Sequence, residues 1–107
     1  MNVRFYTTPG GSSPVERYLA DLEAKERANV LGVLDDIRRN GLEKAQAKAR
    51  QIEGKLWEIK VSRHRVFYVT IKGPEMILLH AYKKQGQKAP RREIDLALAR
   101  MKEVLSG

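Results

Sequence analysis

The spacing of apolar residues changes twice along the chain, and these changes constrain the fold more than any other feature of the sequence. Apolar side chains recur at helical spacing over 14–22 and again over 26–40, and from residue 55 they alternate with polar ones. Helical spacing returns over 90–105. The pattern predicts a hairpin of two amphipathic helices, then a group of strands, then a last helix that packs on the sheet.

Turn-forming residues divide the middle of the chain into three strands. The runs 55–61, 65–72 and 76–82 are separated by short turns at 62–64 and 73–74. Strands joined by such short connections pair with their neighbours in sequence. The spacing therefore predicts an antiparallel meander.

Capping signals set the limits of the first two helices. Ser13, Pro14 and Glu16 form a capping sequence, in which the Ser13 hydroxyl is expected to accept a hydrogen bond from the backbone amide of Glu16. Pro14 suits the first helical position. Asn40-Gly41 is expected to end the second helix, because glycine takes the left-handed conformation without strain.

One segment has no strong pattern. Residues 42–54 are rich in helix-forming side chains, but their apolar stripe is thin, so we interpret them as a loop with at most one helical turn. With a short strand over 2–7, the expected order is β-α-α-β-β-β-α. The predicted fold class is α+β, an antiparallel sheet with the helical hairpin and the C-terminal helix on one face. The other face would then be open for a site.

Length and composition place residues 1–107 in a single domain. The chain has no cysteine, which excludes disulfides and thiolate metal sites and fits a reducing compartment. No apolar run approaches the ~20 residues that a transmembrane helix needs. Arg4 lies in a short N-terminal apolar patch that no longer apolar run follows, so no secretory signal is expected. We therefore expect a cytoplasmic protein with no membrane partner.

Positive charge is concentrated in one part of the sequence. The chain has 21 Lys and Arg against 13 Asp and Glu, a formal net charge of +8. Residues 55–92 contain ten of the basic residues and only two acids, Glu58 and Glu75, so this stretch carries all of the excess. Scattered lysines usually do no more than solubilise a surface. Their concentration in one stretch favours a site for a polyanion, with RNA as the first candidate.

The available side chains exclude several kinds of active site. His64 and His80 are the only histidines, and the chain has no HExxH spacing, so a zinc site is not expected. Gly10-Gly11 lacks the lysine and the spacing of a phosphate-binding loop. No serine has a paired histidine. Any chemistry must therefore use Lys, Arg, His and Tyr, with no metal and no cofactor.

That inventory suits the cleavage of RNA by its own 2′-hydroxyl. The hydroxyl attacks the adjacent phosphate, so the protein need not supply a nucleophile. It must hold the backbone, assist proton transfer and stabilise the negative charge of the phosphorane. Arginine suits the last task, because its guanidinium is always charged and matches the geometry of phosphate.

The second half of the chain contains four motifs in a fixed order. They are Leu56-Trp57-Glu58-Ile59-Lys60-Val61, Arg65-Val66-Phe67-Tyr68, Ile77-Leu78-Leu79-His80-Ala81-Tyr82-Lys83-Lys84, and Lys88-Ala89-Pro90 followed by Glu93-Ile94 and Ala97. Together they resemble the RelE/ParE toxin superfamily, and most closely its phage-derived, HigB-like branch. The resemblance implies the toxin of a type II toxin–antitoxin pair. Members of the RelE and HigB type cleave mRNA in the ribosome, whereas ParE members share the fold and poison DNA gyrase.

The resemblance also implies roles for particular residues. Arg65 matches the family's arginine that contacts the scissile phosphate, and Lys84 lies where RelE-type members have a second phosphate-stabilising arginine. Lysine is a point charge rather than a planar fork, so the match at Lys84 is less close. Lys60 either lines the open face or pairs with Glu58. A role in holding mRNA or ribosomal RNA is assigned to the remaining cations, Arg63, Lys83, Lys88, Arg91 and Arg92.

Proton transfer has several candidates. RelE-type enzymes have a catalytic tyrosine in the C-terminal helix, and this chain has no tyrosine after Tyr82. His80 and Tyr82 alternate onto one face of the last strand, together with Met76 and Leu78. On an open face His80 or Tyr82 would assist proton transfer, and on a core face both would be packing residues. A lysine is the other candidate to replace the missing tyrosine. His64 is interpreted as a solvated turn residue.

The leading hypothesis is a ribosome-dependent, metal-independent endoribonuclease toxin. Its partners would be mRNA on the ribosome and a cognate antitoxin, a small helix-turn-helix protein that covers the basic face. The first alternative is a ParE-like, non-enzymatic inhibitor of DNA gyrase on the same fold. The second is a plain RNA-binding module, against which stands the small number of aromatic residues suited to base stacking.

Overall fold

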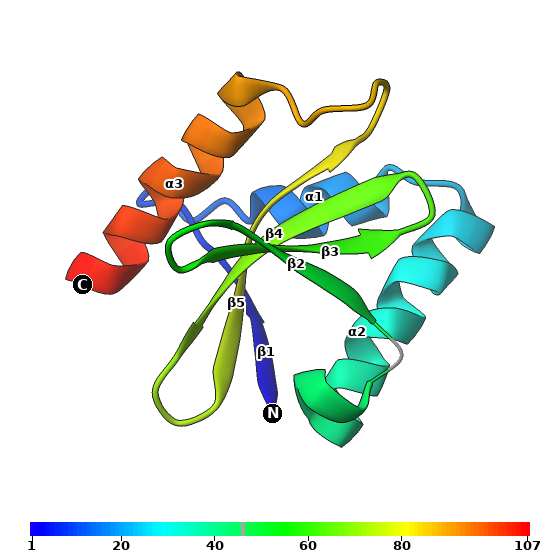
Figure 1. Cartoon of the computed structure of the whole chain (residues 1–107), viewed down its shortest axis with the longest axis horizontal. Coiled ribbons are helices and arrows are strands. Elements are labelled where there is room, and N and C mark those ends of the chain that lie inside the picture. The colour runs from blue at the N-terminus through cyan, green and yellow to red at the C-terminus, as the bar shows by residue number, and fades with distance from the viewer. Residues whose placement is uncertain (46) are drawn as a thin grey trace.

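The sheet at the centre of the molecule has five strands, and helices lie on both of its sides (Figure 1). The computed structural model describes residues 1–45 and 47–107. In chain order the elements are β1 (Asn2–Phe5), α1 (Pro14–Ala20), α2 (Ala24–Lys44), β2 (Lys48–Glu53), β3 (Leu56–Val61), β4 (His64–Ile71), β5 (Glu75–Lys83) and α3 (Arg91–Ser106). The predicted α+β class and the meander of β3, β4 and β5 are confirmed.

The order across the sheet is β1-β5-β4-β3-β2. β1 runs parallel to β5, and all the other neighbours are antiparallel. The register between β4 and β5 shifts once, because Phe67 is opposite His80 whereas Tyr68 is opposite Leu78. Leu79 is therefore the extra residue of a β-bulge in β5. The bulge changes the face onto which the last residues of β5 point.

The interpretation of residues 42–54 as a loop with at most one helical turn is wrong for residues 48–53, and residue 46 lies outside the described part of the chain. Residues 48–53 form β2, an edge strand that pairs with β3, and residues 42–44 belong to α2. The expected order therefore gains one strand. Ile52 is the one residue of β2 that is not fully exposed, which explains the thin apolar stripe. This strand is formed by pairing with β3 and not by burial of its own side chains.

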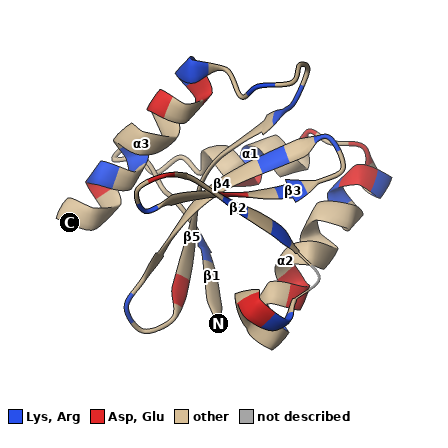
Figure 2. Ribbon diagram, viewed as in Figure 1, with Lys and Arg blue, Asp and Glu red and all other residues tan. Residues whose placement is uncertain are grey.

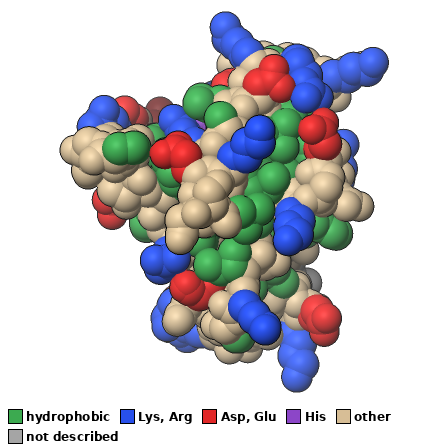
Figure 3. All heavy atoms as spheres, turned by 90° about the vertical axis from the view of Figure 1, so that its left-hand side faces the viewer, with side chains coloured by type: hydrophobic (Ala, Val, Ile, Leu, Met, Phe, Trp, Pro, Cys, Tyr) green, Lys and Arg blue, Asp and Glu red, His purple; other side chains and the backbone are tan. Residues whose placement is uncertain are grey.

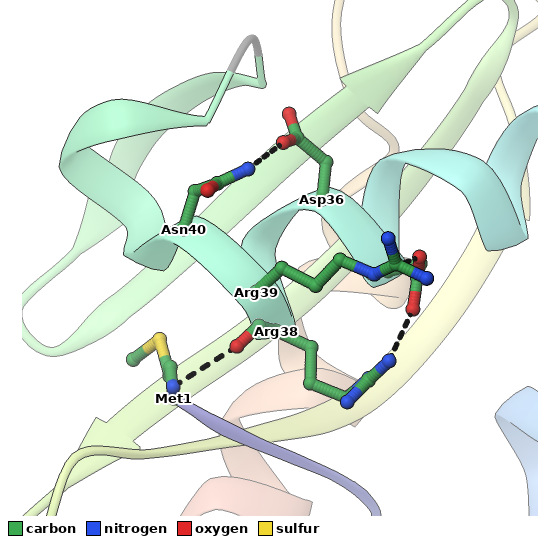
Figure 4. A network of polar contacts seen from close by, with 6 residues as sticks. Met1, Asp36, Arg38, Arg39 and Asn40 are labelled. Carbon is green, nitrogen blue, oxygen red and sulfur yellow. Dashed lines mark hydrogen bonds and ion pairs between the residues drawn. The ribbon is translucent and has the colours of Figure 1, made fainter.

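α2 changes direction at Gly41, close to the predicted helix end. Gly41 has φ 80° and ψ 165°, a conformation that disfavours other residues, and one more helical turn follows it. Polar contacts fix this end of the helix (Figure 4). The amino group of Met1 donates to the Arg38 carbonyl at 3.1 Å, and Asn40 donates to Asp36 at 2.6 Å. The first contact joins the start of β1 to α2.

The two faces of the sheet are covered by different helices. The core under α1 and α2 consists chiefly of Val15, Leu19, Val30, Leu34, Ile37, Ile59, Val66, Tyr68, Met76 and Leu78. The core under α3 consists of Tyr6, Leu56, Phe67, Val69, Ile77, Leu79, Tyr82 and Ala97. The expectation of one fully open face is thus wrong, because α3 packs on the face opposite the hairpin. What stays uncovered is one end of that face.

The predicted side-chain cap at the start of α1 is also wrong. Ser13 does occupy the N-cap position with an extended backbone, and Pro14 follows as the first helical residue. The Ser13 hydroxyl, however, makes no capping hydrogen bond and is buried without a partner among the described residues. The start of α1 is set by Pro14 and by the hydrogen bond from the Arg17 amide to the Ser13 carbonyl.

The surface on the side where α3 ends carries a band of hydrophobic side chains between charged ones (Figure 3). A cavity of about 440 Å³ lies along α3 and is lined by Glu53, Asp95, Leu98, Ala99, Met101 and Lys102. In the described part of the chain, no helix combines the length and the apolar character needed to cross a membrane.

Candidate functional site

Basic residues of β2, β3 and β4, together with Lys84 just past the end of β5, line one cavity at the end of the sheet that α3 leaves uncovered. Figure 2 marks the Lys and Arg positions along these strands in blue. The register places Lys48, Lys60, Arg65 and Tyr82 opposite one another, in one row across β2, β3, β4 and β5. Residues in such a row share a face of the sheet and lie side by side. A cavity of about 250 Å³ opens over this row. It is lined by Lys48, Ala49, Arg50, Glu58, Lys60, Arg65 and Lys84.

Arg65 is the most rigidly held cation of the cavity. Its side chain is only 9% exposed, and its Nη1 donates to the carbonyls of Ser62 and His64 at 2.9 and 3.1 Å. Its Nε lies 3.9 Å from the Glu58 carboxylate. These contacts use Nη1 and Nε of the guanidinium, and the residue still lines the cavity. The predicted phosphate-contacting residue is therefore fixed before any ligand arrives, as transition-state stabilisation by a charged group requires.

Glu58 forms the acidic floor of the cavity. Its Oε1 accepts a hydrogen bond from Arg50 Nη2 at 3.3 Å, whereas its Oε2 is buried with no hydrogen-bond partner among the described residues. The cross-strand neighbours also differ from the predicted Lys60–Glu58 pair, because Glu58 is opposite Arg50 and Phe67. A buried carboxylate needs compensating cations, and Arg50 and Arg65 provide them.

Lys48, Lys60 and Lys84 form the cationic wall of the cavity. Lys60 is exposed and lies between Lys48 and Arg65 in the row, whereas Lys84 is half-buried. The amide of Lys84 donates to the Arg63 carbonyl at 2.8 Å, which continues the β4–β5 pairing past the strand end. A second cavity of about 360 Å³ shares Lys60, Arg65 and Lys84 with the first. Its other lining residues are Ser62, Arg63, Gln85 and Gly86.

His80 lies under the start of α3 and not in the open cavity. Arg100 Nη1 donates to His80 Nδ1 at 3.3 Å, and arginine has no acceptor, so Nδ1 carries no proton. The other nitrogen, Nε2, then donates to the Glu93 carboxylate at 2.9 Å. Burial lowers the pKa of His80 below 6.5, against the effect of Glu93. His80 is thus a neutral residue with both nitrogens occupied.

Tyr82 is buried next to His80 and Phe67. Its ring stacks against Phe67 at a centroid distance of 5.6 Å, and its hydroxyl has no hydrogen-bond partner among the described residues. Burial, and then the charge of Glu58, raise the pKa of Tyr82 to about 12. The bulge at Leu79 places His80 and Tyr82 on the face opposite Met76 and Leu78, so the predicted shared register is wrong.

His64 is not a solvated turn residue, as its place beside the β3–β4 turn had suggested. It begins β4 and is 2% exposed. Its ring points to the face covered by α1 and α2, where it contacts Tyr18 and Glu26. No local pattern could predict this burial, because the partners of His64 lie 38 and 46 residues away in the sequence.

The cations assigned to RNA binding divide into separate groups. Arg63 lines the second cavity, and Lys88 lines a third of about 350 Å³ beside Arg50 and Ile94. Lys83 is opposite His64, so its side chain points to the other face of the sheet. Arg91 pairs with Glu53 at 3.2 Å and with Asp95 at 2.9 Å, and Arg92 is exposed on α3.

Sequence reasoning missed Lys48 and Arg50. Both lie on β2, in the segment interpreted as a loop, and both line the cavity. The available signal was the alternation of Lys48, Arg50 and Ile52. The described residues form no group of three or more His, Cys, Asp or Glu side chains suited to a metal ion.

Comparisons with known proteins concern the family and the fold of the chain. A family model described as phage-derived protein Gp49-like matches residues 17–102. A chain from the crystal structure of the archaeal RelE–RelB complex of Pyrococcus horikoshii superposes with a TM-score of 0.60 at 17% sequence identity. The superposition covers 81% of this chain and 97% of that one. No match is found among curated proteins. The RelE-like fold expected from the sequence is thereby confirmed.

Proposed function

The chain belongs to the phage-derived Gp49-like family, and from this premise we propose that it is the toxin of a type II toxin–antitoxin pair and cleaves mRNA on the ribosome. The observation that supports the proposal most strongly is the fixed guanidinium of Arg65 in a cavity walled by Lys48, Lys60 and Lys84. Such a cavity binds an RNA backbone through its phosphates and needs no sequence readout.

In the proposed reaction the ribose 2′-hydroxyl attacks the adjacent phosphate. The bond to the 5′-oxygen of the next nucleotide breaks, which leaves a 2′,3′-cyclic phosphate and a 5′-hydroxyl. Arg65 stabilises the negative charge that develops on the phosphorane, and Lys84 acts as the second cation. The protein supplies position and charge, and no metal or cofactor takes part.

Proton transfer is assigned to a lysine and not to His80 or Tyr82. The nitrogens of His80 are both occupied, and the Tyr82 hydroxyl is buried. The remaining predicted substitute for the missing tyrosine is a lysine, and Lys60 is exposed on the cavity wall beside Arg65. We assign Lys60 to accept the proton of the attacking 2′-hydroxyl, and the leaving 5′-oxygen takes up a proton from solvent.

A defined translation reaction tests this chemistry. Purified protein is added to ribosomes stalled on a short mRNA, and the ends of the products are mapped. We expect one cut, with a cyclic phosphate on the upstream fragment. A single 2′-deoxy nucleotide at the cut position should prevent cleavage, because the attacking hydroxyl is gone. Continued cleavage of that message would exclude the 2′-hydroxyl mechanism.

An antitoxin partner is the second part of the proposal. The similar archaeal chain was solved as a RelE–RelB complex. We propose that this chain likewise binds an antitoxin, a small helix-turn-helix protein with an acidic segment that covers the cationic wall. Both proteins would act in the cytoplasm. Co-expression with the protein encoded by the neighbouring reading frame should relieve toxicity, whereas co-expression with an unrelated DNA-binding protein should not.

One observation favours a second function, inhibition of DNA gyrase in the manner of ParE. α3 contains no tyrosine, although RelE-type nucleases have their catalytic tyrosine in the C-terminal helix. The two functions separate after induced expression. A nuclease leaves cut messages and intact chromosomes, whereas a gyrase inhibitor triggers the response to DNA damage and leaves messages intact.

A further inference from the structure

A partly buried chain of hydrogen bonds centred on the buried His64 joins α1, α2 and the first residue of β4. The hydroxyl of Tyr18 lies 2.6 Å from His64 Nδ1, and the carboxylate of Glu26 lies 3.0 Å from His64 Nε2. A carboxylate only accepts, so His64 Nε2 donates to Glu26, and the hydroxyl of Tyr18 is the partner of Nδ1 on the other side of the ring. Burial, together with Glu26 and Glu93, raises the pKa of Tyr18 to about 12, which keeps its hydroxyl protonated as a donor.

This chain lies on the opposite side of the sheet from the cationic cavity, but it holds the turn that positions Arg65. The guanidinium of Arg65 donates to the carbonyl of His64 and to that of Ser62. Ser62 has φ 55°, a left-handed conformation that serine adopts at some cost. Such a turn keeps its shape only where the surrounding structure holds it in place.

We propose that His64 is a positioning residue for Arg65, an inference that rests on the proposed nuclease function. The imidazole of His64 joins the start of β4 to α1 and α2 by hydrogen bonds. The carbonyls of Ser62 and His64, which accept from Arg65, are thereby held in place. Without the imidazole, the turn and the guanidinium would sample several positions. Misplacement of a reacting group by about 1 Å costs on the order of 100-fold in rate. We expect a loss of about tenfold to 100-fold in the cleavage rate of His64→Ala, with little change in KM.

A double-mutant cycle separates positioning from general damage to the fold. Cleavage is measured for His64→Ala, Arg65→Ala and the double variant. If His64 acts through Arg65, the double variant should cleave no more slowly than Arg65→Ala alone. Val30→Ala is the matched control, because Val30 is a fully buried residue of the same helix as Glu26. It should lower stability without lowering the rate at a temperature where the variant is folded. Additive losses in the cycle would overturn the proposal.

Tyr18→Phe covers the case in which His64→Ala does not fold. It removes only the hydroxyl that donates to His64, and it should lower the cleavage rate severalfold with no change in secondary structure. Glu26→Gln keeps an acceptor for His64 Nε2 and should retain most of the activity, whereas Glu26→Ala should not. Full activity of Tyr18→Phe and Glu26→Ala together would contradict a positioning role.

A readout independent of catalysis distinguishes the failure of this inference from the failure of the proposed function. The NMR signal of the Arg65 side-chain Nε–H reports its mobility in the free protein. We expect a rigid Nε–H in the wild type and a mobile one in Tyr18→Phe and His64→Ala. If the wild type does not cleave RNA but the Nε–H is mobile only in the variants, the proposed nuclease function is rejected and the positioning role of His64 stands. An Nε–H equally rigid in all three proteins would overturn the positioning role.

Discussion

The two faces of β4 show how this molecule separates stability from function. On one face, His64, Val66 and Tyr68 are buried under α1 and α2. On the other, Phe67 and Val69 are buried under α3, but Arg65 lies past the part that the helix covers. Because successive residues of a strand point to opposite faces, a residue that anchors the fold and a residue that faces the cavity are neighbours in sequence.

The cavity exists because α3 covers only part of its face of the sheet. The hairpin buries its face along most of the sheet, whereas α3 has Ala97 as its one fully buried residue. At this uncovered end Lys48, Arg50 and Lys60 are exposed, and the largely buried Arg65 still lines the cavity. Changes on the α3 face near Arg65 should therefore affect activity, and changes on the hairpin face should affect stability.

Arg65→Ala should give the largest effect. Loss of one preorganised charge at a transition state typically costs 100-fold to 1,000-fold, and we expect about that reduction in the rate of mRNA cleavage. Arg65→Lys should recover only part of it, because lysine cannot form the same fork. Single-turnover cleavage on stalled ribosomes measures both. A fully active Arg65→Ala would show that the cavity is not the site.

Truncation of the two cores should give unequal losses of stability. Ile37 is fully buried under the hairpin, so Ile37→Ala should lower the free energy of unfolding by about 3 kcal/mol. Leu98 on α3 is only partly buried, and Leu98→Ala should lower the free energy of unfolding by about half as much. Urea unfolding followed by circular dichroism gives both values. Equal losses would mean that α3 contributes as much as the hairpin does.

Much of this division could be predicted from the sequence, and part of it could not. The alternation of apolar residues identified β3, β4 and β5 and the face shared by Glu58 and Lys60. It missed β2, because an edge strand has little apolar signal of its own. It also misplaced His80 and Tyr82, because a single extra residue at Leu79 reverses the faces of the strand that follows.

The candidate site was predicted in the same uneven way. Arg65 and Lys84 were identified by resemblance, and both line the cavity. Arg50 and Lys48 were not identified, because their place in the site depends on pairing between β2 and β3. The role of His64 was misjudged for a similar reason, since its partners come from helices distant in sequence. Contacts of this kind leave no periodic pattern in the residues themselves.

Lys60→Ala should lower the cleavage rate less than Arg65→Ala does. It should also change how RNA binding depends on the salt concentration. Loss of one phosphate contact lowers the slope of log K against log salt by about one. Lys72→Ala is the control, because Lys72 is exposed in the β4–β5 turn and lines neither cavity that contains Arg65. Binding to a short RNA at several salt concentrations measures the slopes. Equal slopes for the two variants would exclude a contact at Lys60.

The pH dependence of stability should give the smallest effect. The unfolded chain takes up a proton at His80 near pH 6.5, whereas the folded chain does so only at lower pH. The unfolded state therefore binds more protons just below pH 6.5, and stability falls as the pH decreases through that region. His80→Gln should reduce this dependence. Thermal unfolding between about pH 5 and pH 8 compares the two proteins, and an identical dependence would contradict a buried, neutral His80.

The central claim is that the cationic end of the α3 face cleaves mRNA, and mapping RNA ends in growing cells tests it most directly. Wild type, Arg65→Ala and Lys72→Ala are induced for a few minutes, and the 5′ ends of all messages are sequenced. We predict new 5′-hydroxyl ends within translated regions for the wild type and Lys72→Ala, and none for Arg65→Ala. Growth arrest by the wild type with intact messages, or the same cuts with Arg65→Ala, would contradict the claim.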